Sequence, residues 1–167
     1  MTLNARITLG VLAELSHQLD LAAAAAPLTV SKSVPLLHGT GVSQVDRMFA
    51  DTRTVAASAT DSLDLAGGGL TDLLGAAVTF AKLKAVIVAA SAANTNNVVI
   101  TRPAPNGVPL FAAAGDACAV QPGGLFVWVA PGAGVTVTAG TGDLLDLVNS
   151  GAGSTVTYDV VLLGTSA

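Results

Sequence analysis

Short apolar or alternating segments recur between turn-forming residues over residues 52–167, and this spacing constrains the fold more than any other feature of the chain. No long segment of helical period lies between them to act as the crossover helix of a parallel βαβ unit, which needs about a dozen residues. We therefore predict about seven to nine strands in a mainly β domain, a β-sandwich of jelly-roll or related type. The clearest turn signals are Gly67–Gly69, Ser91–Asn97, Pro103–Pro109, Pro122–Gly124 and Pro131–Gly132.

Three segments carry more specific predictions. Residues 125–130 are wholly apolar and include the only tryptophan, Trp128, so we expect a strand buried on both faces. Lys82 and Lys84 fall on one side of an alternating segment, which we expect to face solvent or a partner. Leu70–Leu74 is expected to form one helical turn. The other expected strands are Arg53–Ala59, Ser62–Leu65, the region 77–90, Val98–Thr101, Val135–Ala139, Leu144–Val148 and Thr155–Leu163.

The N-terminal part of the chain differs from the rest. Leu9, Leu12, Leu15 and Leu19 recur at intervals of three and four residues, which predicts an amphipathic helix over residues 9–21. Residues 27–50 contain prolines and glycines without clear periodicity, which is typical of an extended tether. We predict an N-terminal helix and extended arm in residues 1–50 and the β-sandwich domain in residues 51–167.

Composition favours association and disfavours several partners. Only 11% of the residues are charged, whereas 51% are hydrophobic, so a lone copy would show water a weakly repelling surface. All seven lysines and arginines lie in residues 1–103, and residues 104–167 have none to bind a phosphate backbone. No apolar run is long enough to span a bilayer. We expect no nucleic-acid partner and no membrane partner.

The sequence contains no recognisable catalytic or metal-binding pattern. His17 and His38 lie in the N-terminal part, away from the single cysteine, Cys118, so a zinc site lacks ligands. The glycines of residues 132–142 are not followed by the lysine of a phosphate loop. Two acidic groups lack the spacing of an EF-hand: Asp61, Asp64 and Asp72, and Asp143, Asp146 and Asn149. We predict a protein that is not an enzyme and that needs no cofactor.

Three stretches of residues 50–167 resemble a pattern frequent in small virion structural proteins of tailed bacteriophages. They are residues 51–72, the turn Pro122–Gly124 with the apolar strand after it, and residues 137–160, which are the most specific. The resemblance is closest to capsid cement, or decoration, proteins. It implies a homo-oligomer, most often a trimer, that binds the major capsid protein on the outside of the virion head.

Cementing needs buried area rather than chemistry, so the candidate site is a contact surface. The candidate interface residues are Leu9, Leu12, Leu15 and Leu19 of the expected helix, with Met48 and Phe49 where the arm meets the domain. Two alternatives stay open. One is a head-fibre, tail-adaptor or tail-fibre component, and the other is a carbohydrate-binding β-sandwich module that would use Trp128 or Tyr158.

Overall fold

The computed structural model describes residues 2–167, and these residues form fourteen β-strands and no helix. The prediction of a mainly β protein is therefore confirmed. The helix predicted over residues 9–21 and the helical turn predicted at Leu70–Leu74 are both wrong. Residues 9–21 belong to a long β-hairpin, and Leu70 and Thr71 form a short strand.

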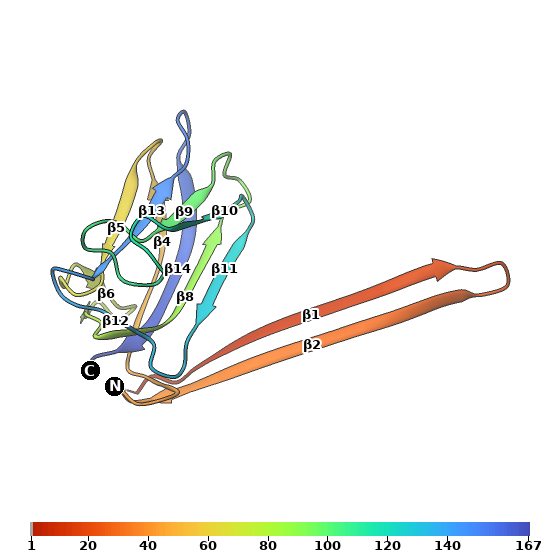
Figure 1. Ribbon diagram of the computed structural model, residues 1–167, viewed down its shortest axis with the longest axis horizontal. Coiled ribbons are helices and arrows are strands. Elements are labelled where there is room, and N and C mark those ends of the chain that lie inside the picture. Colours follow the sequence, from red (N-terminus) through yellow and green to blue (C-terminus); the bar gives the residue numbers. More distant parts are fainter. Residues whose placement is uncertain (1) are drawn as a thin grey trace.

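The larger sheet of the domain has five strands in the order β11-β8-β14-β4, with β12 pairing the beginning of β8 (Figure 1). All pairings within it are antiparallel. Strands β8 and β14 are its centre, and β14 pairs with β4 without interruption and with β8 through one register shift. The strands are β4 (Arg47–Val55), β8 (Lys82–Ala90), β11 (Leu125–Val129), β12 (Val135–Thr136) and β14 (Val156–Thr165).

The smaller sheet has four antiparallel strands in the order β10-β9-β13-β5. A separate two-stranded ladder, β6 with β7, closes one end of the domain. The strands are β5 (Thr60–Asp64), β9 (Val98–Thr101), β10 (Ala117–Val120) and β13 (Leu144–Asn149), with β6 (Leu70–Thr71) and β7 (Ala77–Val78).

Both sheets contribute to one hydrophobic core. Alternate residues of β8 and β14, such as Val86 and Leu162, point into it from the five-stranded sheet. Leu63, Ile100 and Leu147 enter it from the four-stranded sheet, and all five side chains are buried. Trp128 is partly buried and packs against this core from β11.

Residues 5–38 project from the domain as one long antiparallel hairpin (Figure 1). Its strands are β1 (Ala5–Gln18) and β2 (Ala23–His38), paired without interruption from Ala5–Leu36 to Gln18–Ala23. The short strand β3 (Gln44–Val45) runs parallel to the end of β2 and leads the chain into β4. The extended arm expected in this region is thus a regular two-stranded ribbon.

Two further predictions for individual segments are wrong. The apolar strand β11 is covered on one face only, and Leu125 on the other face is 61% exposed. Lys84 does not face solvent, because it shares the alternation of the core residues Val86 and Val88. Its side chain is 2% exposed and donates to the carbonyl oxygens of Pro131 and Gly132, beside a register shift between β8 and β14.

Candidate interaction surface

One face of the hairpin is apolar along almost its whole length. Cross-strand partners in a sheet share a face, and the pairs Ile7–Val34, Val11–Val30 and Ala13–Leu28 all lie on this one. Val11 is 45% exposed and Val30 is 40% exposed, so residues 2–167 leave much of both side chains open to solvent. The hairpin apolar face consists of Ala5, Ile7, Leu9, Val11, Ala13 and Leu15 of β1 and Ala26, Leu28, Val30, Lys32, Val34 and Leu36 of β2.

The opposite face of the hairpin is mainly polar or small. It carries the pairs Arg6–Pro35, Thr8–Ser33 and Glu14–Pro27, and the Thr8 and Ser33 hydroxyls lie within 3.5 Å of each other. The ribbon is therefore amphipathic with the period of two that belongs to a strand buried on one side. A two-stranded ribbon is marginally stable in water, and a third strand or a packed apolar face is needed to hold it.

The outer edge of β2 is protected against pairing with another strand. Leu37 donates its backbone N–H to Ser43 of the β3 segment, so odd-numbered residues of β2 direct their backbone groups away from β1. Pro27 and Pro35 are odd-numbered and have no N–H to donate. A strand added along this edge would lose two ladder hydrogen bonds, so contact through the apolar face is favoured over edge pairing.

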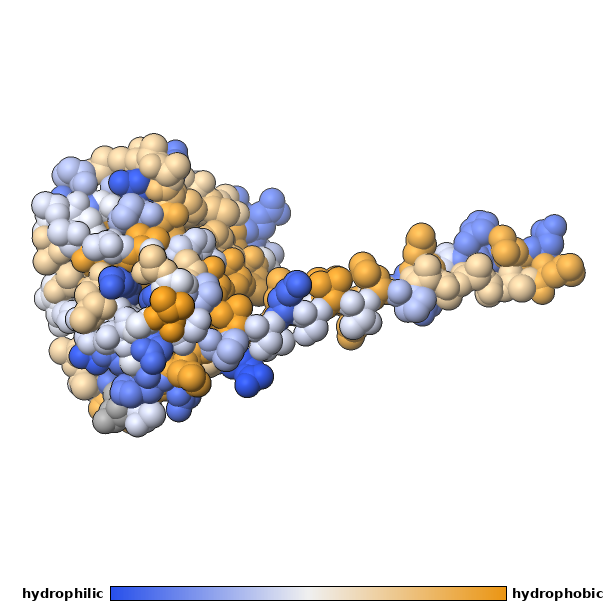
Figure 2. All heavy atoms as spheres, turned by 60° about the horizontal axis from the view of Figure 1, so that its bottom comes forward, coloured by the Kyte–Doolittle hydropathy of each residue, from blue (hydrophilic) through white to orange (hydrophobic). Residues whose placement is uncertain are grey.

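A second apolar surface lies on the domain itself, on the face of the five-stranded sheet that points away from the core. We call it the outer sheet face. Figure 2 shows hydrophobic side chains both along the projecting hairpin and on the side of the domain next to it. Its outward positions are Met48, Ala50, Thr52 and Thr54 of β4, Ala85, Ile87 and Ala89 of β8, Leu125, Val127 and Val129 of β11, and Thr157, Asp159, Val161 and Leu163 of β14.

The hairpin apolar face and the outer sheet face meet where the hairpin joins the domain. Leu36 and Val45 are completely buried there against Ala85 and Leu163. Partly buried side chains from both surfaces complete this second cluster: Leu3, Ala5, Ile7, Val34, Met48, Val129 and Val161. The two surfaces are thus parts of one apolar strip, packed together at the hairpin root and open on either side of it.

The six candidate interface residues lie in different parts of the structure and do not form one surface. Leu9 and Leu15 lie together on the hairpin apolar face, at 55% and 78% exposed, whereas Leu12 points to the opposite face. Leu19 begins the turn at the hairpin tip. Met48 belongs to the outer sheet face. Phe49 is 3% exposed within the core, so its side chain is not open to a partner.

Several surface residues were missed because the sequence was read with a helical period. The alternation Ile7, Leu9, Val11, Ala13, Leu15 was present in the sequence and is the strand signal that would have found the hairpin apolar face. The β2 half of that face needed the pairing register, since its Val30 and Val34 lie among prolines and polar residues.

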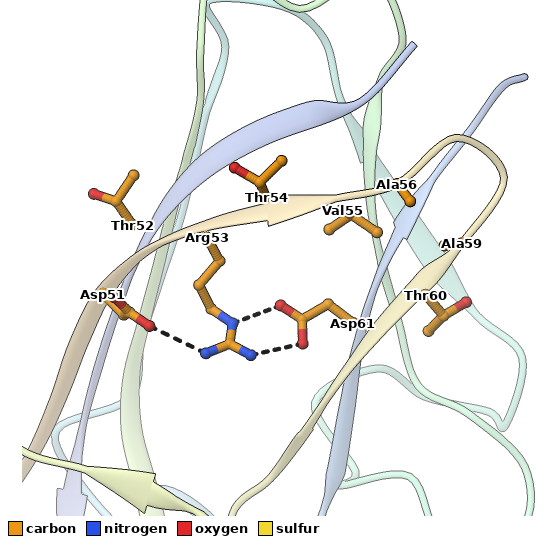
Figure 3. A pocket seen from close by; sticks show the side chains of 9 residues that line it. All are labelled: Asp51, Thr52, Arg53, Thr54, Val55, Ala56, Ala59, Thr60 and Asp61. Atoms are coloured by element: carbon orange, nitrogen blue, oxygen red, sulfur yellow. Dashed lines mark hydrogen bonds and ion pairs between the residues drawn. The ribbon is translucent and has the colours of Figure 1, made fainter. Parts of the chain in front are cut away.

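A polar cluster spans the two sheets at one end of the core, beside a pocket of about 380 Å³ (Figure 3). Arg53 of β4 donates from Nε and Nη2 to both carboxylate oxygens of Asp61 on β5, at 2.5 and 2.9 Å. The Tyr158 hydroxyl donates to the same carboxylate at 2.8 Å, and Asp51 accepts from Arg53 Nη1 at 3.1 Å.

The protonation of this cluster follows from those contacts. The hydrogen bond to Asp61 raises the pKa of Arg53 above its ordinary value. Burial alone would raise the pKa of Asp61, but hydrogen bonds from Arg53 and Tyr158 outweigh burial, and the pKa is lowered. Burial and the bond to Asp61 raise the pKa of Tyr158. All three groups keep one charge state near neutrality, so the cluster is suited to joining sheets rather than to proton transfer.

A second pocket, of about 510 Å³, lies between the N-terminal residues and the β6–β7 turn. Leu73 and Leu74 line it and are largely exposed, and Met48 contributes from β4. The pocket is predominantly apolar and extends the exposed apolar surface beyond the hairpin root.

No family model, curated protein or solved structure matches the chain. Within residues 2–167, no group of three or more His, Cys, Asp or Glu side chains is arranged to hold a metal ion. The same residues contain no helix that could cross a bilayer.

Proposed function

We propose that this protein is a structural assembly protein and, more specifically, a capsid cement protein of a tailed bacteriophage. In this role it binds the outside of the virion head as an oligomer, most simply a trimer. It stabilises contacts between major capsid subunits. The mechanism is burial of apolar surface and needs no enzymatic step or cofactor.

The observation that carries the proposal is the exposed apolar face of the long hairpin. Fully burying a Leu or Val side chain is worth about 1.5–3 kcal/mol, so leaving a row of them in water is costly. A surface of this kind is expected to be covered in the working state of the protein. A projecting arm also reaches across a subunit boundary, which adds contact area without a larger domain core.

The assignment to a phage head is supported by the resemblance of residues 50–167 to virion proteins. The low charged fraction supports it as well, since a shell protein has much of its surface covered by neighbours. The shared core of the two sheets is consistent with a β-sandwich of jelly-roll or related type, which we propose as the fold. Attachment at many equivalent points on a shell would also make individually modest contacts effective.

The carbohydrate-binding alternative has less support from its two aromatic residues. A sugar ring needs the open face of an aromatic side chain, and Tyr158 is buried with its hydroxyl bound to Asp61. Trp128 is partly exposed, but it also packs against the core.

The test is quantitative mass spectrometry of purified virions, with the ratio of this protein to the major capsid protein as the readout. About one copy per major capsid subunit supports a shell-covering cement protein, because multivalent attachment requires many copies. A ratio of a few per cent would move the protein to a head fibre or a tail component. Complete absence from virions would reject a virion role altogether.

A further inference from the structure

We propose that the hairpin apolar face of one copy packs on the outer sheet face of a second copy, with Lys32 of the hairpin paired to Asp159 of the neighbouring sheet. This inference deepens the proposed function, since it names the contact by which copies would join each other. It does not depend on the capsid, because both surfaces belong to this chain.

The charges of the two surfaces are complementary. Lys32 is the one lysine, arginine or carboxylate residue among the positions of the hairpin apolar face, and its side chain is exposed. Asp159 is the one charged residue among the outward positions of the outer sheet face, and it is also exposed. Each surface thus carries a single charge, and the two charges are opposite, although the outer sheet face also carries the threonines Thr52, Thr54 and Thr157.

Both charges have apolar neighbours on their surfaces. Lys32 lies opposite Leu9 on the hairpin and between Val30 and Val34 of its own strand. Asp159 lies opposite Ala89 on β8 and near Val161, and on β4 it lies opposite Thr52, whose hydroxyl donates to it at 2.6 Å. When the apolar neighbours are packed together, the charged pair is shielded from water and its attraction is strengthened.

Packing between these two kinds of surface already occurs within the chain. At the root, Ala5, Ile7 and Val34 of the hairpin contact the cluster that includes Ala85 and Val161 of the sheet. The hairpin of a neighbour would extend the same type of packing over the part of the outer sheet face that is still open, including Leu125 and Val127.

The hairpin is long enough to reach another copy and is directed away from its own sheet. Its first strand has 14 residues, and at a rise of about 3.4 Å per residue it spans about 48 Å. Figure 1 shows the hairpin extending away from the domain, so its outer half cannot cover the sheet from which it departs. A hairpin-to-sheet contact joins different surfaces, so it forms a ring such as a trimer when the rotation between successive copies closes, and an open filament when it does not.

A crosslinking experiment tests which surfaces meet. Leu9→Cys and Ala89→Cys are placed on separate full-length chains in a Cys118→Ser background, and the two chains are co-expressed with different affinity tags. We expect a thiol crosslink that joins the two tags, and no crosslinked dimer from either variant expressed alone. Crosslinking of Leu9→Cys with itself would overturn the proposal in favour of hairpin-to-hairpin packing.

Charge exchange tests the pairing of Lys32 with Asp159. Mass measurement in solution over a dilution series is expected to show a self-associating wild-type protein. Lys32→Asp and Asp159→Lys should each weaken self-association about tenfold or more, and the double variant should recover most of that loss. Arg6→Asp and Glu14→Lys, on the opposite face of the hairpin, are matched controls that should remain near wild type. Equal effects of all four single variants, or no rescue in the double variant, would contradict the pairing.

The outcomes separate this inference from the proposed function. A protein that stays monomeric at all concentrations yet is abundant in virions rejects the hairpin-to-sheet contact and leaves the cement role intact. A self-associating protein with charge rescue that is absent from virions supports the contact and rejects the cement role.

Discussion

Arg53 on β4 and Asp61 on β5 form a two-point ion pair that ties the five-stranded sheet to the four-stranded sheet. The Arg53 side chain is partly exposed and that of Asp61 is more buried. The hydroxyl of Tyr158 on β14 donates a third hydrogen bond, so the Asp61 carboxylate accepts hydrogen bonds from two strands of the opposite sheet. This arrangement leads to two predictions for the stability of the domain.

Asp61→Asn is expected to lower the free energy of unfolding by about 1–3 kcal/mol, because it removes a charged acceptor of three hydrogen bonds. Asp51→Asn is the matched comparison. Asp51 accepts one bond from the same Arg53 in a more exposed position, so its loss should cost about 0–1 kcal/mol. Urea unfolding of both variants measures the difference, and equal losses would show that the position of Asp61 between the sheets is unimportant.

The same carboxylate should make the domain sensitive to acid. The pKa of Asp61 is lowered in the folded protein, so the unfolded chain binds its proton more readily and stability falls with decreasing pH. The contribution is fully present above the ordinary Asp value of 3.8 and is lost as the pH falls from that value through the lower folded pKa. Denaturation midpoints of wild type and Asp61→Asn, measured between neutral pH and this region, should converge at the acid end.

Adjacent residues on opposite faces of β2 should respond differently to a new charge. Val30→Asp places a carboxylate on the hairpin apolar face and should weaken self-association about tenfold or more, equivalent to about 1.4 kcal/mol. Ser31→Asp places the same charge one residue later on the polar face and should have little effect. Dilution series of the two variants provide the measurement, and similar behaviour of both would argue that the face is not buried in the assembly.

Cleavage by trypsin tests whether self-association buries the hairpin, without the need for a mutation. Lys32 is exposed in the middle of the hairpin, and an isolated two-stranded ribbon opens readily. Dilute protein should be cut after Lys32, whereas concentrated or assembled protein should be protected there. Peptide mapping over a dilution series reads out the cleavage, and a rate independent of concentration would contradict burial of the hairpin.

We expect Lys84 to stabilise the hairpin root through hydrogen bonds to the loop that follows β11. Its ammonium group donates to Gly132 and Pro131, and the Pro131 carbonyl also accepts from the Ser43 backbone N–H at 2.7 Å. Lys84→Met keeps the length of the side chain but removes these bonds, which should cost about 1–2 kcal/mol. Hydrogen exchange at the Ser43 amide should become faster, and an unchanged rate would show that the loop is held by other contacts.

The sequence predicted the strands of the domain better than it predicted the arm, for a physical reason. In Thr155–Leu163 the inward Val156, Tyr158, Val160 and Leu162 alternate with outward residues, and the core requires that period. Residues 7–19 fit two hydrophobic periods. Leu12 and Leu19 complete an apolar stripe with the spacing of a helix. Ile7, Val11 and Ala13 complete an alternation with the spacing of a strand. Pairing with β2 decides between them, and that is a contact between distant parts of the chain.

The errors at Lys84 and at residues 125–130 have other causes. Val86 and Val88 of β8 face the core, so alternation places Lys84 on the inward side as well, next to a bulge that alternation alone does not locate. The prediction of a strand buried on both faces is wrong for β11, because residues 2–167 cover one face only. We propose that a neighbouring copy covers the other face.

The two prolines of β2 affect whether copies that are not yet assembled aggregate into fibres. A newly made chain with an uncovered row of leucines and valines on a ribbon is at risk of adding strand after strand into a fibre. Pro27 and Pro35 interrupt that growth at the β2 edge, so free chains can accumulate with the hairpin apolar face uncovered and one route to amyloid closed.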